Sequence, residues 1–93
     1  MKFEWDQNKS QSNLKKHGID FEEARSVFHD MFALIIDDPY HCNSEQREII
    51  VGQSSEGRFL YVVFEETESS IRIISARKLT SAERRRYEQN RPD

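Results

Sequence analysis

The chain has 93 residues, of which 35% are hydrophobic and 33% charged, and its formal net charge is −3. This length supports one domain with one core, and six Phe, three Tyr and one Trp argue against a disordered chain. No apolar run approaches the roughly 18 residues of a membrane span, and the single cysteine, Cys42, excludes an internal disulfide. We therefore expect one cytoplasmic domain over residues 1–93.

The chain begins with a predicted strand and helix. The segment KFEW, residues 2–5, is typical of a short strand, and Asp6 after it is placed to cap a helix. That helix is predicted to run to Lys16 or His17, where Gly18 suits the left-handed conformation that ends many helices.

A second helix is predicted over about residues 20–30. Asp20, with Glu23 three residues later, has the spacing of a capping box. The helical period then places several apolar side chains near one face, namely Phe21, Ala24, Val27 or Phe28, and Met31 or Phe32.

The middle of the chain predicts four antiparallel strands, because apolar runs alternate there with turn-prone segments. SSEG, between the second and third runs, is a good hairpin connection. The runs are FALIID (32–37), REIIVGQ (47–53), RFLYVVFEE (58–66) and SIRIISA (70–76).

A last helix is predicted to begin at the capping box of Thr80 and Glu83 and to run to about Asn90, before Pro92. The order of elements indicates an α+β domain. It has a short N-terminal strand, two helices, an antiparallel four-stranded sheet and a C-terminal helix.

Charge is distributed unevenly along the chain. Residues 1–18 hold four Lys against two acids, and residues 71–92 hold seven Lys or Arg against Glu83 and Glu88. Residues 19–70 hold twelve acids against three Arg. If the two ends of the chain meet, they form a cationic surface that could hold a polyanion. The alternative is that RRRYEQNR is simply a solvated helix face.

Lys15, Lys16 and His17 are predicted to occupy the last turn of the first helix. Cations there are stabilised by the partial negative charge of the helix end, which is a sufficient structural explanation for the cluster. Histidine is also the side chain that most easily exchanges a proton near neutral pH, so His17 is a candidate for proton transfer.

Two segments together resemble the BrnT family of type II toxins. FEWDQNKSQSNLKKHGIDFEEA, residues 3–24, follows the pattern FEWDxxKxxxNxxKHGIxFEEA, and IRIISARKLTSAERRRYE, residues 71–88, resembles the closing strand and helix of that family. The resemblance implies a RelE-like ribonuclease fold, with an mRNA-cleaving or otherwise growth-arresting activity. It also implies a BrnA-type antitoxin with a ribbon-helix-helix DNA-binding domain, in a heterotetramer that contacts DNA only through the antitoxin.

RNA cleavage without a metal needs a base for the 2′-hydroxyl, an acid for the leaving 5′-oxygen and cations around the phosphorane. With the resemblance in view, we hypothesise that His17 and Glu48 transfer protons and that Arg72 and Arg77 stabilise the phosphorane. The candidates for RNA binding are Lys16, Arg58 and Tyr87.

Strand alternation places a condition on this hypothesis. Arg72 shares a parity with Ile74 and Ala76, whereas Arg77 has the opposite parity, so the two arginines share a face only if the strand ends or bulges between them. Considered alone, Glu48 is also explained as an exposed strand residue, and Arg72 as a member of a cross-strand ion pair.

No metal or other cofactor is expected. His41 and Cys42 adjoin and His29 lies upstream, but no pair among them has the spacing of a zinc ligand set. Trp5 is either a core residue or a platform on which a base could stack.

Two other functions compete with the ribonuclease. The two helices joined at HGID superficially resemble a helix-turn-helix, but its recognition helix would begin with Asp20, Glu22 and Glu23, which DNA phosphates repel. The chain could also be a binding module that holds a protein partner or nucleic acid without cleaving it.

Overall fold

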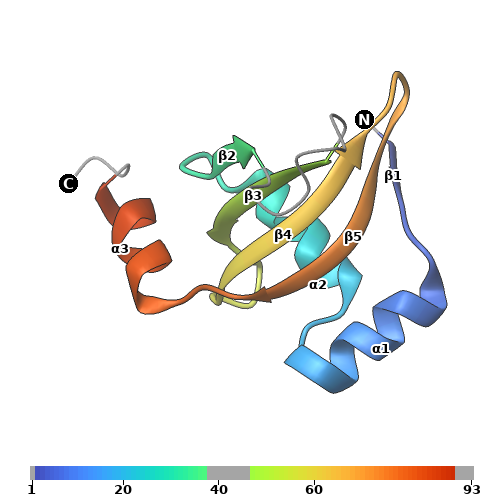
Figure 1. Cartoon of the computed structure of the whole chain (residues 1–93), viewed down its shortest axis with the longest axis horizontal. Coiled ribbons are helices and arrows are strands. Elements are labelled where there is room, and N and C mark those ends of the chain that lie inside the picture. The colour runs from blue at the N-terminus through green and yellow to red at the C-terminus, as the bar shows by residue number, and fades with distance from the viewer. Residues whose placement is uncertain (1, 38–46, 90–93) are drawn as a thin grey trace.

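A computed structural model of the chain describes residues 2–37 and 47–89 and has the predicted α+β architecture (Figure 1). In chain order the elements are β1 (Lys2–Glu4), α1 (Gln7–His17), α2 (Phe21–Ser26), the 3-10 helix η1 (Val27–His29), β2 (Leu34–Asp37), β3 (Arg47–Gln53), β4 (Phe59–Glu66), β5 (Ser70–Lys78) and α3 (Ser81–Gln89). No helix in these ranges is both long and apolar enough to cross a membrane.

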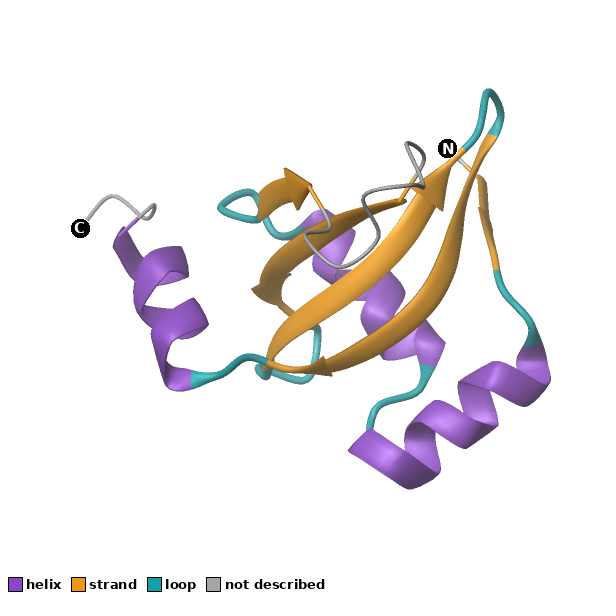
Figure 2. Cartoon of the chain, viewed as in Figure 1, coloured by secondary structure: helices purple, strands orange, loops and turns teal. Residues whose placement is uncertain are grey.

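The strands form one sheet in the order β1-β5-β4-β3-β2 (Figure 2). Strands β2 to β5 are the predicted antiparallel meander. The predicted sheet of four strands has a fifth, because β1 pairs in parallel with β5, with Phe3 opposite Ile71. That contact spans two helices and three strands of sequence, so the local pattern that predicted β1 carried no information about its partner.

Both ends of α1 follow the predicted capping chemistry. The Asp6 carboxylate accepts hydrogen bonds from the backbone N–H groups of Asn8 and Lys9, at 2.8 and 3.3 Å. Gly18 is left-handed, with φ of 73°, and its N–H bonds to the carbonyl of Leu14 at 2.8 Å. The glycine is required there because an L side chain is strained at this φ.

The second helical segment covers the predicted range but changes from α2 to the tighter η1 at Val27. Asp20 caps it by accepting a hydrogen bond from the N–H of Glu23 at 2.9 Å. Phe21, Ala24 and Val27 are buried as the helical period predicted. Met31 is not part of this face; it is 86% exposed, because the helix ends at residue 29.

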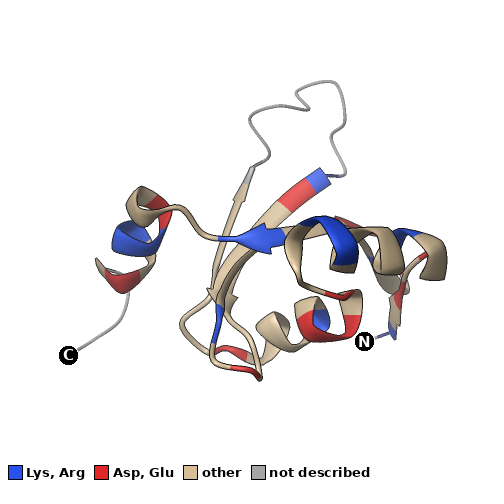
Figure 3. Ribbon diagram, turned by 90° about the horizontal axis from the view of Figure 1, so that it is seen from below, with Lys and Arg blue, Asp and Glu red and all other residues tan. Residues whose placement is uncertain are grey.

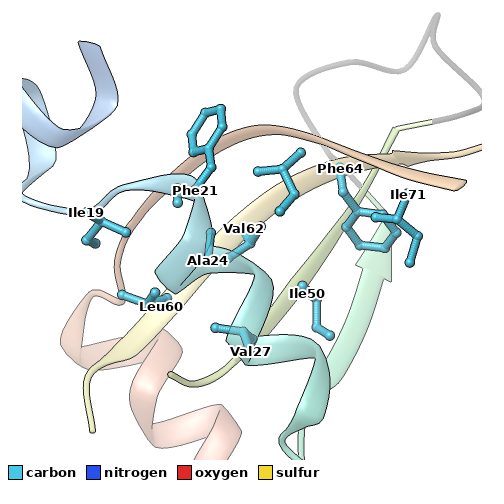
Figure 4. Packing of buried hydrophobic residues seen from close by; sticks show 11 residues of the cluster. Ile19, Phe21, Ala24, Val27, Ile50, Leu60, Val62, Phe64 and Ile71 are labelled. Carbon is cyan, nitrogen blue, oxygen red and sulfur yellow. The ribbon is translucent and has the colours of Figure 1, made fainter. Parts of the chain in front are cut away.

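The main core lies between α2 and one face of the sheet, which we call the helix face (Figure 4). Trp5 packs against this core, edge-on to Phe21 at 6.5 Å, which favours its structural role. The opposite face carries a smaller cluster built on Ile49, Val51 and Tyr61. The buried residues of the main core are Ile19, Phe21, Ala24, Val27, Ile50, Leu60, Val62, Phe64, Ile71, Ile73 and Ala76.

Candidate active site

The predicted site residues lie at two different ends of the sheet. We call the end where β4 begins and β5 ends the basic end; its cations are Lys16, Arg58, Arg77, Lys78 and Arg84, with His17 beside them. We call the end where β4 ends and β5 begins the paired end; its charged residues are Glu4, Arg47, Glu65 and Arg72.

At the basic end, Asn13 fixes α1 against β5. Its side-chain amide donates to the carbonyl of Ala76 at 2.8 Å and accepts from the N–H of Ala76 at 3.2 Å, as a neighbouring strand would. The same NH₂ group also donates to the carbonyl of Ile19 at 2.7 Å. Since β1 pairs only as far as Arg72, Asn13 closes the edge of β5 where β1 no longer reaches. The last turn of α1, with exposed His17, is thereby held beside the end of β5.

Arg58 ties the same helix end to β4. Its guanidinium forks onto both carboxylate oxygens of Glu23, with Nε at 2.9 Å from Oε2, and Nη2 donates to the carbonyl of Gly18 at 3.0 Å. The Ser54 hydroxyl donates to the same carboxylate at 2.7 Å. The backbone N–H of Glu23 therefore donates to the Asp20 cap, while the Glu23 carboxylate, expected to complete a capping box, binds Arg58 instead.

This ion pair fixes the protonation state of both partners. The hydrogen bonds from Arg58 lower the pKa of Glu23, against the opposing effect of its burial, and those to Glu23 raise the pKa of Arg58. Glu23 is thus ionised at neutral pH and has no proton to donate to a leaving group.

Arg77 is at the basic end but on the other face of the sheet. It pairs with Tyr61 in the register, and its guanidinium carbon lies 3.8 Å from the centroid of that ring. Its two terminal nitrogens bind the carboxylate of Glu83 at 2.8 and 2.9 Å. The hydrogen bonds from Arg77, with further ones from Thr80, lower the pKa of Glu83 to about 2. The capping box of Thr80 and Glu83 is confirmed in both directions.

A bulge in β5 meets the condition for Arg72 and Arg77 to share a face. Val63 pairs with Ser75 but the next residue, Phe64, pairs with Ile73, so Ile74 is the extra residue. The two arginines nevertheless lie opposite Glu65 and Tyr61, which are four residues apart along β4, about 13 Å at strand spacing.

Arg72 belongs to the paired end, where four charges alternate across neighbouring strands. It lies opposite Glu65 and Glu4 in the register, with Nη1 3.9 Å from Glu4 Oε1, and Arg47 Nε lies 3.4 Å from Glu65 Oε1. This is the cross-strand ion pairing that remained open for Arg72 in the sequence.

Glu48 joins neither group of arginines. It pairs with Phe64, a residue of the main core, and therefore lies on the helix face, opposite to Arg72 and Arg77. Along β3, Glu48 is also three residues away from Val51. Val51 pairs with Tyr61, which in turn pairs with Arg77, so these three residues lie on one line across the sheet. The structure does not bring Glu48 to His17.

The family model described as "Ribonuclease toxin, BrnT, of type II toxin-antitoxin system" matches residues 5–83. The chain belongs to the BrnT family. The crystal structure of the Brucella abortus ribonuclease toxin, BrnT, has a TM-score of 0.68 and 25% identity, and the match covers 87% of this chain and 99% of that one. No curated protein matches the chain.

Of the three predicted RNA-binding residues of this BrnT-family toxin, Lys16 is exposed, Arg58 is half-buried and Tyr87 is buried. Tyr87 is completely buried: its hydroxyl donates to Asp30 at 2.6 Å, and its ring packs on Phe59 at 5.4 Å. It anchors α3 to the rest of the domain and has no surface to offer to RNA while α3 keeps this position.

Three residues at the basic end were missed by the sequence analysis: Asn13, Lys78 and Arg84. Lys78 lies opposite Leu60, a residue of the main core, and is therefore on the helix face; the alternation after Ala76 was the available signal. In Figure 3 the basic segments of α3, of the end of β5 and of α1 follow one another across the view.

The three residues considered as metal ligands are His29, His41 and Cys42. His41 and Cys42 lie outside the described residues, and His29 is exposed at the end of η1. Within residues 2–37 and 47–89, no group of three or more His, Cys, Asp or Glu side chains could hold a metal ion.

Proposed function

We propose that this BrnT-family toxin is an endoribonuclease that cleaves RNA without a metal, by acid–base catalysis centred on His17. The observation that carries the proposal is the double anchoring of the end of α1. Asn13 binds it to β5 and Arg58 binds it through the Gly18 carbonyl, so the exposed His17 is held at the basic end beside Arg58.

Each group at the basic end has a chemical role in this proposal. His17 takes the 2′-hydroxyl proton or supplies one to the leaving 5′-oxygen, since imidazole does both near neutral pH. Lys16 and Arg58 stabilise the charge of the phosphorane. Arg77 could stabilise the phosphorane only if the phosphate displaced Glu83 from its guanidinium. Arg72 and Glu48 lie outside a site that includes His17. We therefore place these three outside the catalytic group.

The test is cleavage of RNA by the purified chain in EDTA, with naked RNA and with translating ribosomes. We expect products with 2′,3′-cyclic phosphate ends and a rate at least about 100-fold lower for His17→Ala, a typical loss for a general acid or base. His29→Ala, which removes another exposed histidine, is the matched control and should cleave at the wild-type rate. A folded His17→Ala protein with full activity would refute the assignment.

We further propose that a BrnA-type antitoxin with a ribbon-helix-helix domain neutralises the toxin in the cytoplasm. Because that DNA-binding domain would dimerise, the complex would be a heterotetramer that reaches DNA only through the antitoxin. Sizing the co-expressed pair by light scattering tests this stoichiometry, and a complex with one copy of each chain would contradict it.

A non-catalytic binding module is the second candidate, and one observation favours it. Arg58, Arg72 and Arg77 each face a carboxylate already, which reduces the charge available to a phosphorane. In that case the wild type would bind RNA or a protein partner in the same assay, and neither naked RNA nor ribosome-bound mRNA would be cut.

A further inference from the structure

The basic end contains a hollow of about 350 Å³ beside Arg58, toward α3. None of the described residues that line it is acidic, and its volume falls within the range of sites that hold small ligands. The lining residues are Gly57, Arg58, Phe59, Lys78, Leu79 and Arg84.

We propose that this hollow is an RNA-binding subsite, in which Lys78 and Arg84 hold a backbone phosphate and the Arg84 guanidinium carries the adjoining base. The inference rests on the proposed function, and it assigns to the substrate a path from His17 past Arg58 to α3.

Two cations of the hollow are available to a phosphate. Lys78 is exposed at the end of β5 and forms no ion pair with any residue in the described part of the chain. Arg84 is exposed on α3, and its one ion pair with a residue in 2–37 or 47–89 is with Glu88, one helical turn away, at 3.0 Å. Exposed pairs of this kind are weak, so a phosphate can compete for the guanidinium.

The aromatic wall of the hollow suits a nucleobase. The guanidinium carbon of Arg84 lies 4.2 Å from the centroid of the Phe59 ring, and Tyr87 packs behind that ring at 5.4 Å. A guanidinium laid over a fixed ring presents a flat, positively charged surface, and unpaired bases of RNA stack on such surfaces.

A second hollow, on the α2 side of Arg58, shows why RNA would take this direction. It is larger, about 570 Å³, but Asp20, Glu22, Glu23 and Glu56 are among its lining residues. These carboxylates repel phosphate, so the two hollows that share Arg58 present opposite charge to a strand of RNA. An acidic protein segment could also bind the cations, but it would gain nothing from the stacked guanidinium.

The experiment uses the full chain with His17→Ala, to prevent cleavage, and measures binding of a fluorescent single-stranded RNA in EDTA at several salt concentrations. The test variant adds Lys78→Gln and Arg84→Gln. The control adds Lys2→Gln and Arg25→Gln, which remove the same charge. Arg25 matches Arg84 because it also pairs with a carboxylate of its own helix and lies over a phenylalanine ring, that of Phe3.

We expect the test variant to bind about tenfold more weakly and its salt slope to fall by about 1.4, the value for two lost phosphate contacts on a single strand. The control should change the dissociation constant by less than about twofold.

Equal binding by the two variants, or no RNA binding by the parent, would overturn the inference. Loss of antitoxin binding with RNA binding intact would instead assign the hollow to an acidic protein. Failure of the wild type to cleave RNA would overturn the proposed function, and the binding data would still decide on the subsite.

Discussion

The two ends of the sheet close the edge of β5 in different ways. At the paired end, β1 supplies a parallel strand, and Arg47, Glu65, Arg72 and Glu4 alternate across four strands. At the basic end β1 is absent, and the side chain of Asn13 replaces it. Each arginine thus faces a carboxylate at the paired end, whereas at the basic end helix and strand ends add the exposed Lys16, Lys78 and Arg84 to two arginines that are also paired.

The difference shows that strand register, more than composition, decides where cations are free to bind an anion. In a ladder of paired strands, each charged residue faces a fixed neighbour, and opposite charges there stabilise the sheet. Where elements end, side chains approach from several directions and their charges add. The basic end accordingly combines residues from α1, β4, β5 and α3 (Figure 3).

The largest expected effect comes from removing the side chain that substitutes for β1. Asn13→Ala leaves the buried N–H and C=O of Ala76 without their partner, and we expect a loss of about 3 kcal/mol in the free energy of unfolding. Urea denaturation measures this loss. Asn8→Ala, on the exposed side of the same helix, is the control and should cost less than about 0.5 kcal/mol. Equal effects would show that Asn13 does not close the sheet.

Arg58→Ala should lose about 2 kcal/mol, because the buried carboxylate of Glu23 keeps its charge and loses its main partner. On the proposed mechanism, RNA cleavage should also fall at least about tenfold, because Arg58 would no longer stabilise the phosphorane. At the paired end, Arg47→Ala should cost less than about 1 kcal/mol and leave cleavage unchanged. A larger effect for Arg47 would reverse the comparison of the two ends.

The bond between Arg77 and Glu83 predicts a dependence of stability on pH. The folded pKa of Glu83, about 2, lies below its ordinary value of 4.5, so the carboxylate stabilises the fold above pH 4.5. Glu83→Gln should therefore cost about 1 kcal/mol at pH 7, the scale of a helix cap. The difference from the wild type should shrink as the pH falls from 5 toward 2.

Thermal unfolding of both proteins across this pH range measures the difference. Glu88→Gln, in the exposed pair on α3, is the control and should differ from the wild type by less than about 0.5 kcal/mol at pH 7. A gap between wild type and Glu83→Gln that stays constant down to pH 2 would contradict the assignment.

The smallest effects are expected at the two residues that the original hypothesis placed in the catalytic group but the structure places elsewhere. Glu48→Gln and Arg72→Gln should each keep the cleavage rate within about twofold of the wild type and change stability by less than about 1 kcal/mol. Loss of cleavage by a folded Glu48→Gln protein would show that the helix face at the far end takes part in the reaction.

Local chemistry was predictable from the sequence. Caps at Asp6, Gly18, Asp20 and Thr80 depend on residues within one turn of one another, and the structure confirms all four. The four antiparallel strands follow from alternation and turn residues, which are equally local.

The assembly of the site depended on contacts that no local pattern encodes. The bulge at Ile74 places Arg72 on the same face as Arg77. The partner of Glu23 is Arg58, which lies 35 residues away in the sequence. Tyr87 was predicted to bind RNA, but an aromatic ring in a basic helical segment can also anchor the helix by being buried. Asn13 belongs to the N-terminal motif, but its role in closing the edge of β5 follows only from its hydrogen bonds to Ala76.

The most direct test of where RNA binds is a titration of the His17→Ala protein with a 2′-O-methyl RNA, followed by amide chemical shifts in NMR spectra. We predict that the shifts change at residues 15–18, 57–59 and 78–84, which form the basic end. Changes confined to residues 47–49 and 65–72, at the paired end, would contradict this account.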